Sequence, residues 1–304
     1  SGAYQVGLST HYYDSSTLQN SRFIGFQIWY PLNPHAEKHL KYQSKEVVEA
    51  SGKFLGWPLF ANSYFSVLES YSAENLPIAP GKKFPVILYN HGYGGFSSVY
   101  QTVFEELASH GYIVVSIAHE NESALVIKED GSVLANDPNS NVYKSRAFEL
   151  NGPEINGIQD VLLNSDSIDE NRKAYQQLVA RSPLHNASTR LWAQDTREVI
   201  RKLRDLNKNH PLFKSAFDFN SIGVFGHSVG GAVAGQLAAD DAVIKAGINL
   251  DGFQFGDLIN GQFKVPFMFV SSNQKGDTYL RFLSFAEASQ ADCYQAIVKG
   301  FSHG

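Results

Sequence analysis

The sequence predicts an α/β fold in which a mostly parallel central sheet of about eight strands is flanked by helices on both faces. Apolar, strand-like runs alternate with helical segments along most of the chain. In the clearest example, a buried-type strand at 82–90 precedes an amphipathic segment at 98–110 and a second strand at 112–118. Strand, helix and strand joined by short turns form a parallel crossover unit. The third observation is a strand, a tight turn and a helix of small residues at 221–239.

The length and composition favour one large domain. The chain has 304 residues, of which 43% are apolar and 18% are charged, so a sizeable core is expected and disorder is not. We predict a single domain over residues 1–304. Within it we expect an apolar, cover-like insertion at about 42–80 and a polar insertion of loops and helices at about 121–190.

Charge and cysteine usage exclude several function classes. The net charge of -5 argues against nucleic acid as a main partner. No apolar run approaches the roughly 18 residues of a membrane span. The single cysteine, Cys293, is expected to be a buried small hydrophobe. One cysteine permits either a cytosolic or a secreted protein, and we slightly favour a secreted or periplasmic location over a cytoplasmic one. The chain begins with Ser1 and not with Met, and the sequence leaves open whether a signal peptide was removed there.

The remaining elements follow from periodicity and turn residues. Strands at 4–8 and 23–31 are expected to open the sheet as an antiparallel edge, and Asp130-Gly131 indicates a hairpin turn. The apolar stripe after Ala187 predicts a long helix. This helix is expected at 187–207, and three later strands are expected at 243–250, 265–271 and 294–298.

The residues Gly226-His227-Ser228-Val229-Gly230 fit G-x-S-x-G in the context that a nucleophile elbow requires. A strand precedes the motif and a helix follows, so Ser228 is expected in a strained turn above the sheet of an α/β-hydrolase fold. Residues 300–304 also fit the pattern, but no helix follows them in this sequence. We therefore reject that second match as a nucleophile.

A serine nucleophile needs a base and an acid. In α/β-hydrolases the acid follows the serine along the chain, and the histidine that acts as the base follows the acid. His303 is the only histidine after Ser228, whereas His227 adjoins the serine and is expected to point away from it. Asp251 and Asp277 each follow a predicted strand, and the residues alone leave both open as the acid.

Two further stretches bear on the site. His91-Gly92-Tyr93-Gly94-Gly95 follows a central strand, where backbone N–H groups can hold an oxyanion, and no phosphate-binding pattern accompanies it. The apolar stretch 51–71 is expected either to pack on the core, to cover the site or to meet lipid. His35 and His39 lie four apart, but no third ligand is evident, so we expect neither a metal nor a cofactor.

Five motifs stand in order along the chain, namely Ser51–Gly56, Asn90–Gly95, Ala108–Val114, Gly226–Gly231 and Gly247–Phe253. Taken together, they give the chain a resemblance to the platelet-activating factor acetylhydrolases of the plasma and intracellular type II group. The resemblance covers most of residues 4–303 and is diffuse at 123–190.

The resemblance implies specific site residues. It favours Asp251 over Asp277 as the acid, because the family's acid stands in a Leu-Asp segment followed closely by an aromatic residue. It also implies that the oxyanion amides belong to Tyr93 and Val229. The family often has tryptophan at the place of Phe253. We expect Phe54, Leu55 and Phe253 to contact the substrate.

The sequence therefore predicts a serine hydrolase of carboxylic esters with the triad Ser228, Asp251 and His303. By resemblance the substrate is a phospholipid with a short or oxidised sn-2 acyl chain, with possible peripheral membrane contact near 51–71. One alternative is a general lipase, polyester hydrolase or dienelactone-type esterase. Another is an inactive α/β-hydrolase scaffold that binds a lipid or a protein.

Overall fold

A computed structural model describes residues 2–303 apart from 16–21, 33–39, 59, 61–63, 66, 259–261 and 273–284. By its internal contacts the chain divides into two compact units. Unit 1 comprises residues 1–138 and 195–222, and unit 2 comprises residues 139–194 and 223–304. The interpretation of the chain as a single domain with two insertions stays a prediction.

The elements of unit 1 are mainly strands. They are β1 (Gln5–Ser15), β2 (Arg22–Leu32), β3 (Ser72–Glu74), β4 (Phe84–Asn90), β5 (Ile113–His119), β6 (Leu125–Ile127) and β7 (Val133–Ala135), with helices α1 (Lys45–Leu55) and α3 (Gln101–Ser109). The boundary between the units falls within α7 (Pro183–Asn209) and within β8 (Phe217–His227).

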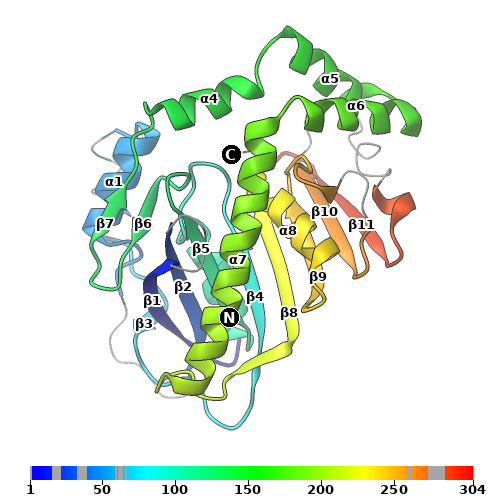
Figure 1. Ribbon diagram of the computed structural model, residues 1–304. Helices are drawn as coiled ribbons and strands as arrows, with labels where there is room; N and C mark the ends of the chain where they lie inside the picture. The colour runs from blue at the N-terminus through cyan, green and yellow to red at the C-terminus, as the bar shows by residue number, and fades with distance from the viewer. Residues whose placement is uncertain are drawn as a thin grey trace. The chain divides into compact units, whose positions relative to one another are not determined.

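The elements of unit 2 alternate between helices and strands. They are α4 (Asn141–Glu149), α5 (Pro153–Asn164), α6 (Ile168–Ala180), α8 (Val229–Asp240), β9 (Ile244–Leu250), β10 (Phe267–Ser272) and β11 (Cys293–Val298). Strands β9, β10 and β11 lie side by side in this order and run parallel, and α8 packs against β9 (Figure 1).

In unit 1 the neighbouring strands follow the order β4, β5, β2, β1 and β3. β4 and β5 are parallel, as the crossover pattern predicts, and every residue of β5 is buried. β1 and β2 form the long antiparallel pair seen in dark blue in Figure 1. The predicted α/β class with a large, mostly parallel sheet and helices around it is confirmed.

The expected antiparallel pairing of the first two strands is confirmed, but the expectation that this pair forms the edge of the sheet was wrong. The short strand β3 pairs with β1 in parallel register, with Val6 opposite Ser72 and Leu8 opposite Glu74. Three residues are too few to give a period-2 pattern, so the sequence carried no strand signal there.

The predicted hairpin turn at Asp130-Gly131 is confirmed. It joins β6 and β7, which pair in antiparallel register. Gly131 has φ of 81°, a left-handed conformation that suits glycine, and the Asp130 carboxylate accepts the Ser132 N–H at 2.9 Å.

Helix α1 has a defined start and end. The Ser44 hydroxyl accepts the Val47 N–H, and Gly56 ends the helix in the left-handed region. Its buried face packs in an apolar cluster with residues of β6 and of the loops before β6. The members are Val47, Phe96, Ala124, Leu125 and Ile127. Phe54 is partly buried against this cluster. Among the residues that the structure describes, no helix is long and apolar enough to cross a membrane.

Candidate active site

The turn between β8 and α8 has the geometry of a nucleophile elbow. Ser228 has φ of 56° and ψ of -120°, a strained conformation for a residue with a side chain. Its N–H donates to the Leu250 carbonyl at 2.9 Å, which ties the turn to β9. Helix α8 begins at the next residue, and its first ten residues are buried. The small side chains after Ser228 thus let the helix sit close to the sheet.

Within unit 2 the structure brings Ser228, Asp251 and His303 together. His303 Nε2 lies 3.1 Å from Ser228 Oγ, and His303 Nδ1 lies 2.8 Å from Asp251 Oδ2. Because an ionised carboxylate only accepts hydrogen bonds, Nδ1 carries the proton and donates it to Asp251. Nε2 is then free of hydrogen and can accept the Ser228 proton.

Asp251 is held by the ends of two strands. Its N–H donates to the Val270 carbonyl at 2.7 Å, and its φ is 56°. The Ser272 N–H donates to Oδ1 at 2.8 Å, and the Ser272 hydroxyl donates to Oδ2 at 2.7 Å. Burial raises the pKa of the Asp251 carboxyl, but the hydrogen bonds from His303 and Ser272 outweigh burial and lower the pKa to about 2. Asp251 is therefore ionised near neutral pH.

His227 does not point away from the site, so that expectation was wrong. Its Nε2 donates to the His303 carbonyl oxygen at 2.9 Å, and the two imidazole rings lie 4.9 Å apart at 35°. Burial, and then the neighbouring His303, lower the pKa of His227, which favours the neutral ring. The motif predicts only the backbone turn and contains no information on where the x residue directs its side chain.

Ser272 is a contact that the sequence analysis missed. It ends β10, which runs parallel to β9. The available signal was its position: Ser271-Ser272 closes a predicted strand at the edge where Asp251 also emerges.

The two predicted oxyanion residues occupy different units. Val229 is the first residue of α8, where helix N–H groups lack partners within the helix. Tyr93 stands in the turn after β4 in unit 1. That turn is fixed by the Gly95 N–H to the Gly92 carbonyl at 2.8 Å and by the Gly94 N–H to the Glu122 carbonyl at 3.0 Å. The joint oxyanion hole stays a prediction.

The three predicted substrate contacts also stay predictions. Phe54 packs against the apolar cluster of α1, and the neighbouring Leu55 is 48% exposed. Phe253 is half-buried, and its ring lies 6.3 Å from the rings of Tyr175 and Phe255.

Other candidates lie outside the described residues. Asp277, the alternative acid, falls within 273–284, and the pair His35 and His39 falls within 33–39. Over the described part of the chain, no group of three metal-ligating side chains comes together.

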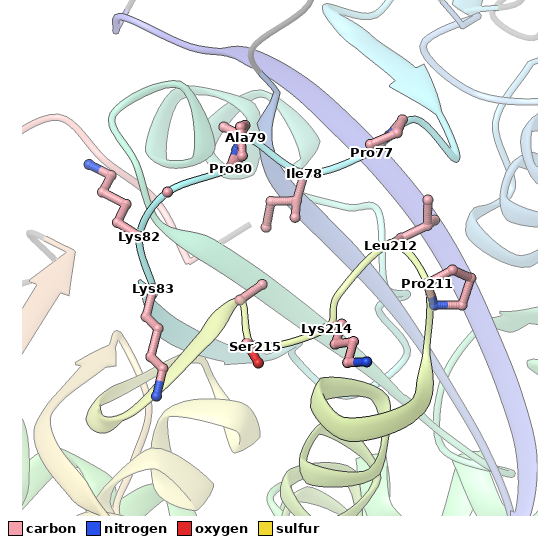
Figure 2. A pocket seen from close by; sticks show the side chains of 12 residues that line it. Pro77, Ile78, Ala79, Pro80, Lys82, Lys83, Pro211, Leu212, Lys214 and Ser215 are labelled. Carbon is pink, nitrogen blue, oxygen red and sulfur yellow. The ribbon is translucent and has the colours of Figure 1, made fainter.

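A pocket of about 510 Å³ in unit 1 has no part in this arrangement (Figure 2). Its lining comes from residues 77–83, just before β4, and from residues 211–216, just before β8, and it includes Lys82, Lys83 and Lys214. In α/β sheets ligands bind at the carboxyl ends of the strands, whereas this pocket lies at their amino ends. The Lys82 ammonium is also engaged, 5.0 Å from the centre of the Phe84 ring.

A family model described as "Platelet-activating factor acetylhydrolase, isoform II" matches residues 1–279 of the chain. The match includes Ser228 and Asp251 and stops before His303.

Curated relatives are named platelet-activating factor acetylhydrolase as well. The platelet-activating factor acetylhydrolase of Cavia porcellus is 30% identical over 203 residues, which cover 65% of this chain and 42% of that protein. That of Canis lupus familiaris is 25% identical over 281 residues, covering 90% of this chain and 59% of that protein. The chain thus spans about half the length of the curated relatives that it matches.

A solved structure shares the fold. A ferulic acid esterase from Streptomyces cinnamoneus matches with a TM-score of 0.71 at 20% identity, over 100% of this chain and 76% of that one. At this identity the likeness shows the fold alone, and the expected α/β-hydrolase fold is confirmed.

Proposed function

This chain belongs to the platelet-activating factor acetylhydrolase family, and on that premise we propose that it is a serine hydrolase of lipid carboxylic esters. The observation that carries the proposal is the hydrogen-bonded series from Ser228 Oγ through the His303 ring to the Asp251 carboxylate. This is the arrangement that turns a serine hydroxyl into a nucleophile.

Acylation begins when Ser228 Oγ attacks the acyl carbonyl carbon and His303 Nε2 takes the hydroxyl proton. The carbonyl electron pair moves onto oxygen, where the N–H groups of Val229 and Tyr93 would stabilise the charge, a contribution of about 3–4 kcal/mol per donor. The intermediate then collapses, the bond to the alcohol oxygen breaks, and the alcohol leaves with the proton from His303.

Deacylation repeats the same steps with water. His303 takes a proton from water as the water oxygen attacks the acyl-enzyme, and Ser228 leaves with that proton as the acid is released. Asp251 stays ionised throughout, because the low pKa of its carboxyl lies far below neutral pH. It fixes the tautomer of His303 and stabilises the imidazolium that forms in each step.

The proposed substrate is a phospholipid with a short or oxidised sn-2 acyl chain. Family membership and the names of the mammalian relatives support this class. The products are the free short-chain acid and the lysophospholipid.

We further propose peripheral contact with lipid through an apolar patch of unit 1. We use this name for five exposed apolar side chains that follow one another along the chain at and after the end of α1, namely Leu55, Phe60, Tyr64, Val67 and Tyr71. Their exposed fractions range from 48% to 78%. Large apolar side chains gathered in one short stretch are typical of surfaces that meet lipid or another protein.

The test is acetate release from an sn-2 acetyl phospholipid by the wild type and three variants. Ser228→Ala should lower kcat at least about a thousandfold, and Asp251→Asn should lower it about 10⁴-fold because His303 loses its acceptor and takes the wrong tautomer. Asp277→Asn is the matched control and should retain activity. Full activity of Ser228→Ala or Asp251→Asn would overturn the mechanism.

A chain-length series of p-nitrophenyl esters tests the substrate class. A sharp preference for acetyl over longer chains is expected. Broad tolerance of long acyl chains would leave the mechanism intact and refute the short-chain assignment in favour of a general lipase or esterase.

A further inference from the structure

The loop that carries Asp251, residues 251–257, contacts the nucleophile elbow directly. It begins where β9 ends, beside the Leu250 carbonyl that accepts the Ser228 N–H. Gly252 is buried, and a Cβ atom there would lie 2.1 Å from the Ser228 carbonyl oxygen. The backbone segments of acid and nucleophile therefore pack against each other without an intervening side chain.

The Asn249 side chain fixes the turn after Asp251. This side chain is 1% exposed, and its Oδ1 accepts the Gly252 N–H at 2.8 Å. A Cβ atom at Gly231 of α8 would lie 2.2 Å from the same oxygen. The Asn249 amide thus fills the space that Gly231 leaves open.

The Gln254 side chain fastens the same loop to α8. It is also 1% exposed, and its Nε2 donates to the Ala232 carbonyl of α8 at 2.7 Å. Its Oε1 accepts the Asn249 side-chain N–H at 3.4 Å. A Cβ atom at Gly235 would lie 2.2 Å from Oε1.

Gly231 and Gly235 are one helical turn apart, so they lie on the same face of α8. Each leaves room for one of the two linked amides. These amides are buried, where a hydrogen bond is stronger than in water and an unpaired polar group is costly. They also stand on either side of Asp251, whose left-handed φ of 56° persists only if its surroundings hold it.

We propose that Asn249 and Gln254 are positioning residues that keep the Asp251 carboxylate in register with Ser228 and His303 by fastening the acid loop to α8. The inference rests on the proposed function, in which Asp251 is the acid of the triad. Neither amide reaches the reacting atoms, so their effect is on the position of Asp251. A displacement of about 1 Å in a catalytic group can cost on the order of 100-fold in rate.

The first experiment replaces each amide by an apolar side chain of similar size. In Gln254→Met and Asn249→Leu we expect kcat on p-nitrophenyl acetate to fall about 10- to 100-fold with KM unchanged. Active sites are counted by complete labelling with a fluorophosphonate, so kcat is stated per intact site. The acid limb of the kcat/KM profile should move to lower pH, because a displaced carboxylate stabilises the protonated His303 ring less.

The matched control is Asn171→Leu, which removes another fully buried amide of unit 2, one that donates to the Ser165 and Ser167 carbonyls. It should lower thermal stability and leave kcat and the acid limb where they are in the wild type.

A double-mutant cycle tests the contact itself. Gly235→Ala places a methyl group where the Gln254 amide lies and should lower kcat. In a Gln254→Ala background the same change should cause no further loss, because the displaced amide is gone. This milder substitution also keeps the test decisive if a buried polar-to-apolar change prevents folding.

The outcomes separate the two proposals. Wild-type kcat and an unmoved acid limb in Gln254→Met and Asn249→Leu overturn the positioning role, whatever their stability. Equal loss from Gly235→Ala in both backgrounds does the same. Wild-type activity in Asp251→Asn instead refutes the proposed function, in which Asp251 is the acid.

Discussion

Ser228 and Asp251 both have a φ of 56°, a region that residues with side chains rarely occupy. Each such residue costs on the order of 1–3 kcal/mol, and the surrounding contacts must offset that cost. The Ser228 N–H is bonded to Leu250, and the Asp251 N–H to Val270. The two strained residues are therefore each secured by the carbonyl of a strand residue, β9 for the serine and β10 for the acid.

His11 gives a pH-dependent prediction for stability. Its ring is stacked on Phe26 at 5.1 Å and is 7% exposed. Burial, and then the charges of His210 and Lys202, lower the pKa of His11 to about 4. Glu129 lies 3.9 Å away, but its side chain is 63% exposed, so it offsets burial little.

The sign follows from linkage. The unfolded chain protonates this histidine near its ordinary pKa of about 6.5, well before the folded protein does. We therefore expect folding stability to fall by about 3 kcal/mol between pH 6.5 and pH 4 through this group alone. In His11→Phe this component should vanish. Urea unfolding of both proteins at several pH values across that range gives the free energy of unfolding as a function of pH. An equal dependence on pH in the two proteins would contradict the prediction.

At the scale of elements, a buried ion pair links α7 to two strands of unit 1. Arg22 of β2 donates to both oxygens of Asp195 at 3.1 and 3.2 Å. His119, the last residue of β5, donates from Nδ1 to Asp195 Oδ2 at 2.9 Å, and its Nε2 lies 3.0 Å from the Asn90 amide oxygen at the end of β4. The Asp195 side chain is fully buried. The second half of α7 is thereby fixed to β2 and β5, and through the His119 ring also to the end of β4.

Removing the shared carboxylate should be costly, because it leaves a buried guanidinium without its partner. We expect Asp195→Ala to lower the free energy of unfolding by about 3–5 kcal/mol. Asp205→Ala on the same helix is the control: that carboxylate is 54% exposed and 3.7 Å from Lys202, so its loss should cost less than about 1 kcal/mol. Urea unfolding of both variants decides the matter, and similar values for the two would be inconsistent with the pair.

At the scale of the whole molecule, charge and exposed apolar surface together define how the protein would meet a lipid surface. A net charge of -5 gives no attraction to anionic headgroups. The proposed adsorption therefore relies on apolar side chains, which the apolar patch of unit 1 would provide.

We expect the protein to sediment with zwitterionic phosphatidylcholine vesicles. The triple substitution of Phe60, Tyr64 and Val67 by serine should weaken this binding at least about tenfold, since an apolar side chain contributes about 1.5–3 kcal/mol when fully buried. Phe148→Ser is a matched control, because Phe148 is as exposed as Phe60, at 78%, but lies in α4. Vesicle binding by the triple variant equal to that of the wild type would refute the lipid contact.

Local patterns in the sequence were sufficient for much of the fold. The strand β5 is a continuous apolar run, and α7 carries an apolar stripe. The helix begins at Pro183, one turn before the predicted start at residue 187. The elbow is equally local, because a strand, two glycines and a helix of small residues permit one backbone course around Ser228. Strand β3 carries no such pattern in its own three residues. It is a strand because it pairs with β1, which is distant in the sequence.

By itself, the sequence determined the α/β class and pointed to Ser228 as the proposed nucleophile and, through chain order, to His303 as the histidine to expect. Between Asp251 and Asp277 the residues alone could not choose. The tertiary structure places the Asp251 carboxylate 2.8 Å from His303, directs His227 onto the His303 carbonyl, and lays Asn249 and Gln254 against two glycines of α8. The physical reason is range: a turn or a strand depends on neighbouring residues, whereas a hydrogen bond between side chains depends on where the ends of separate strands come together.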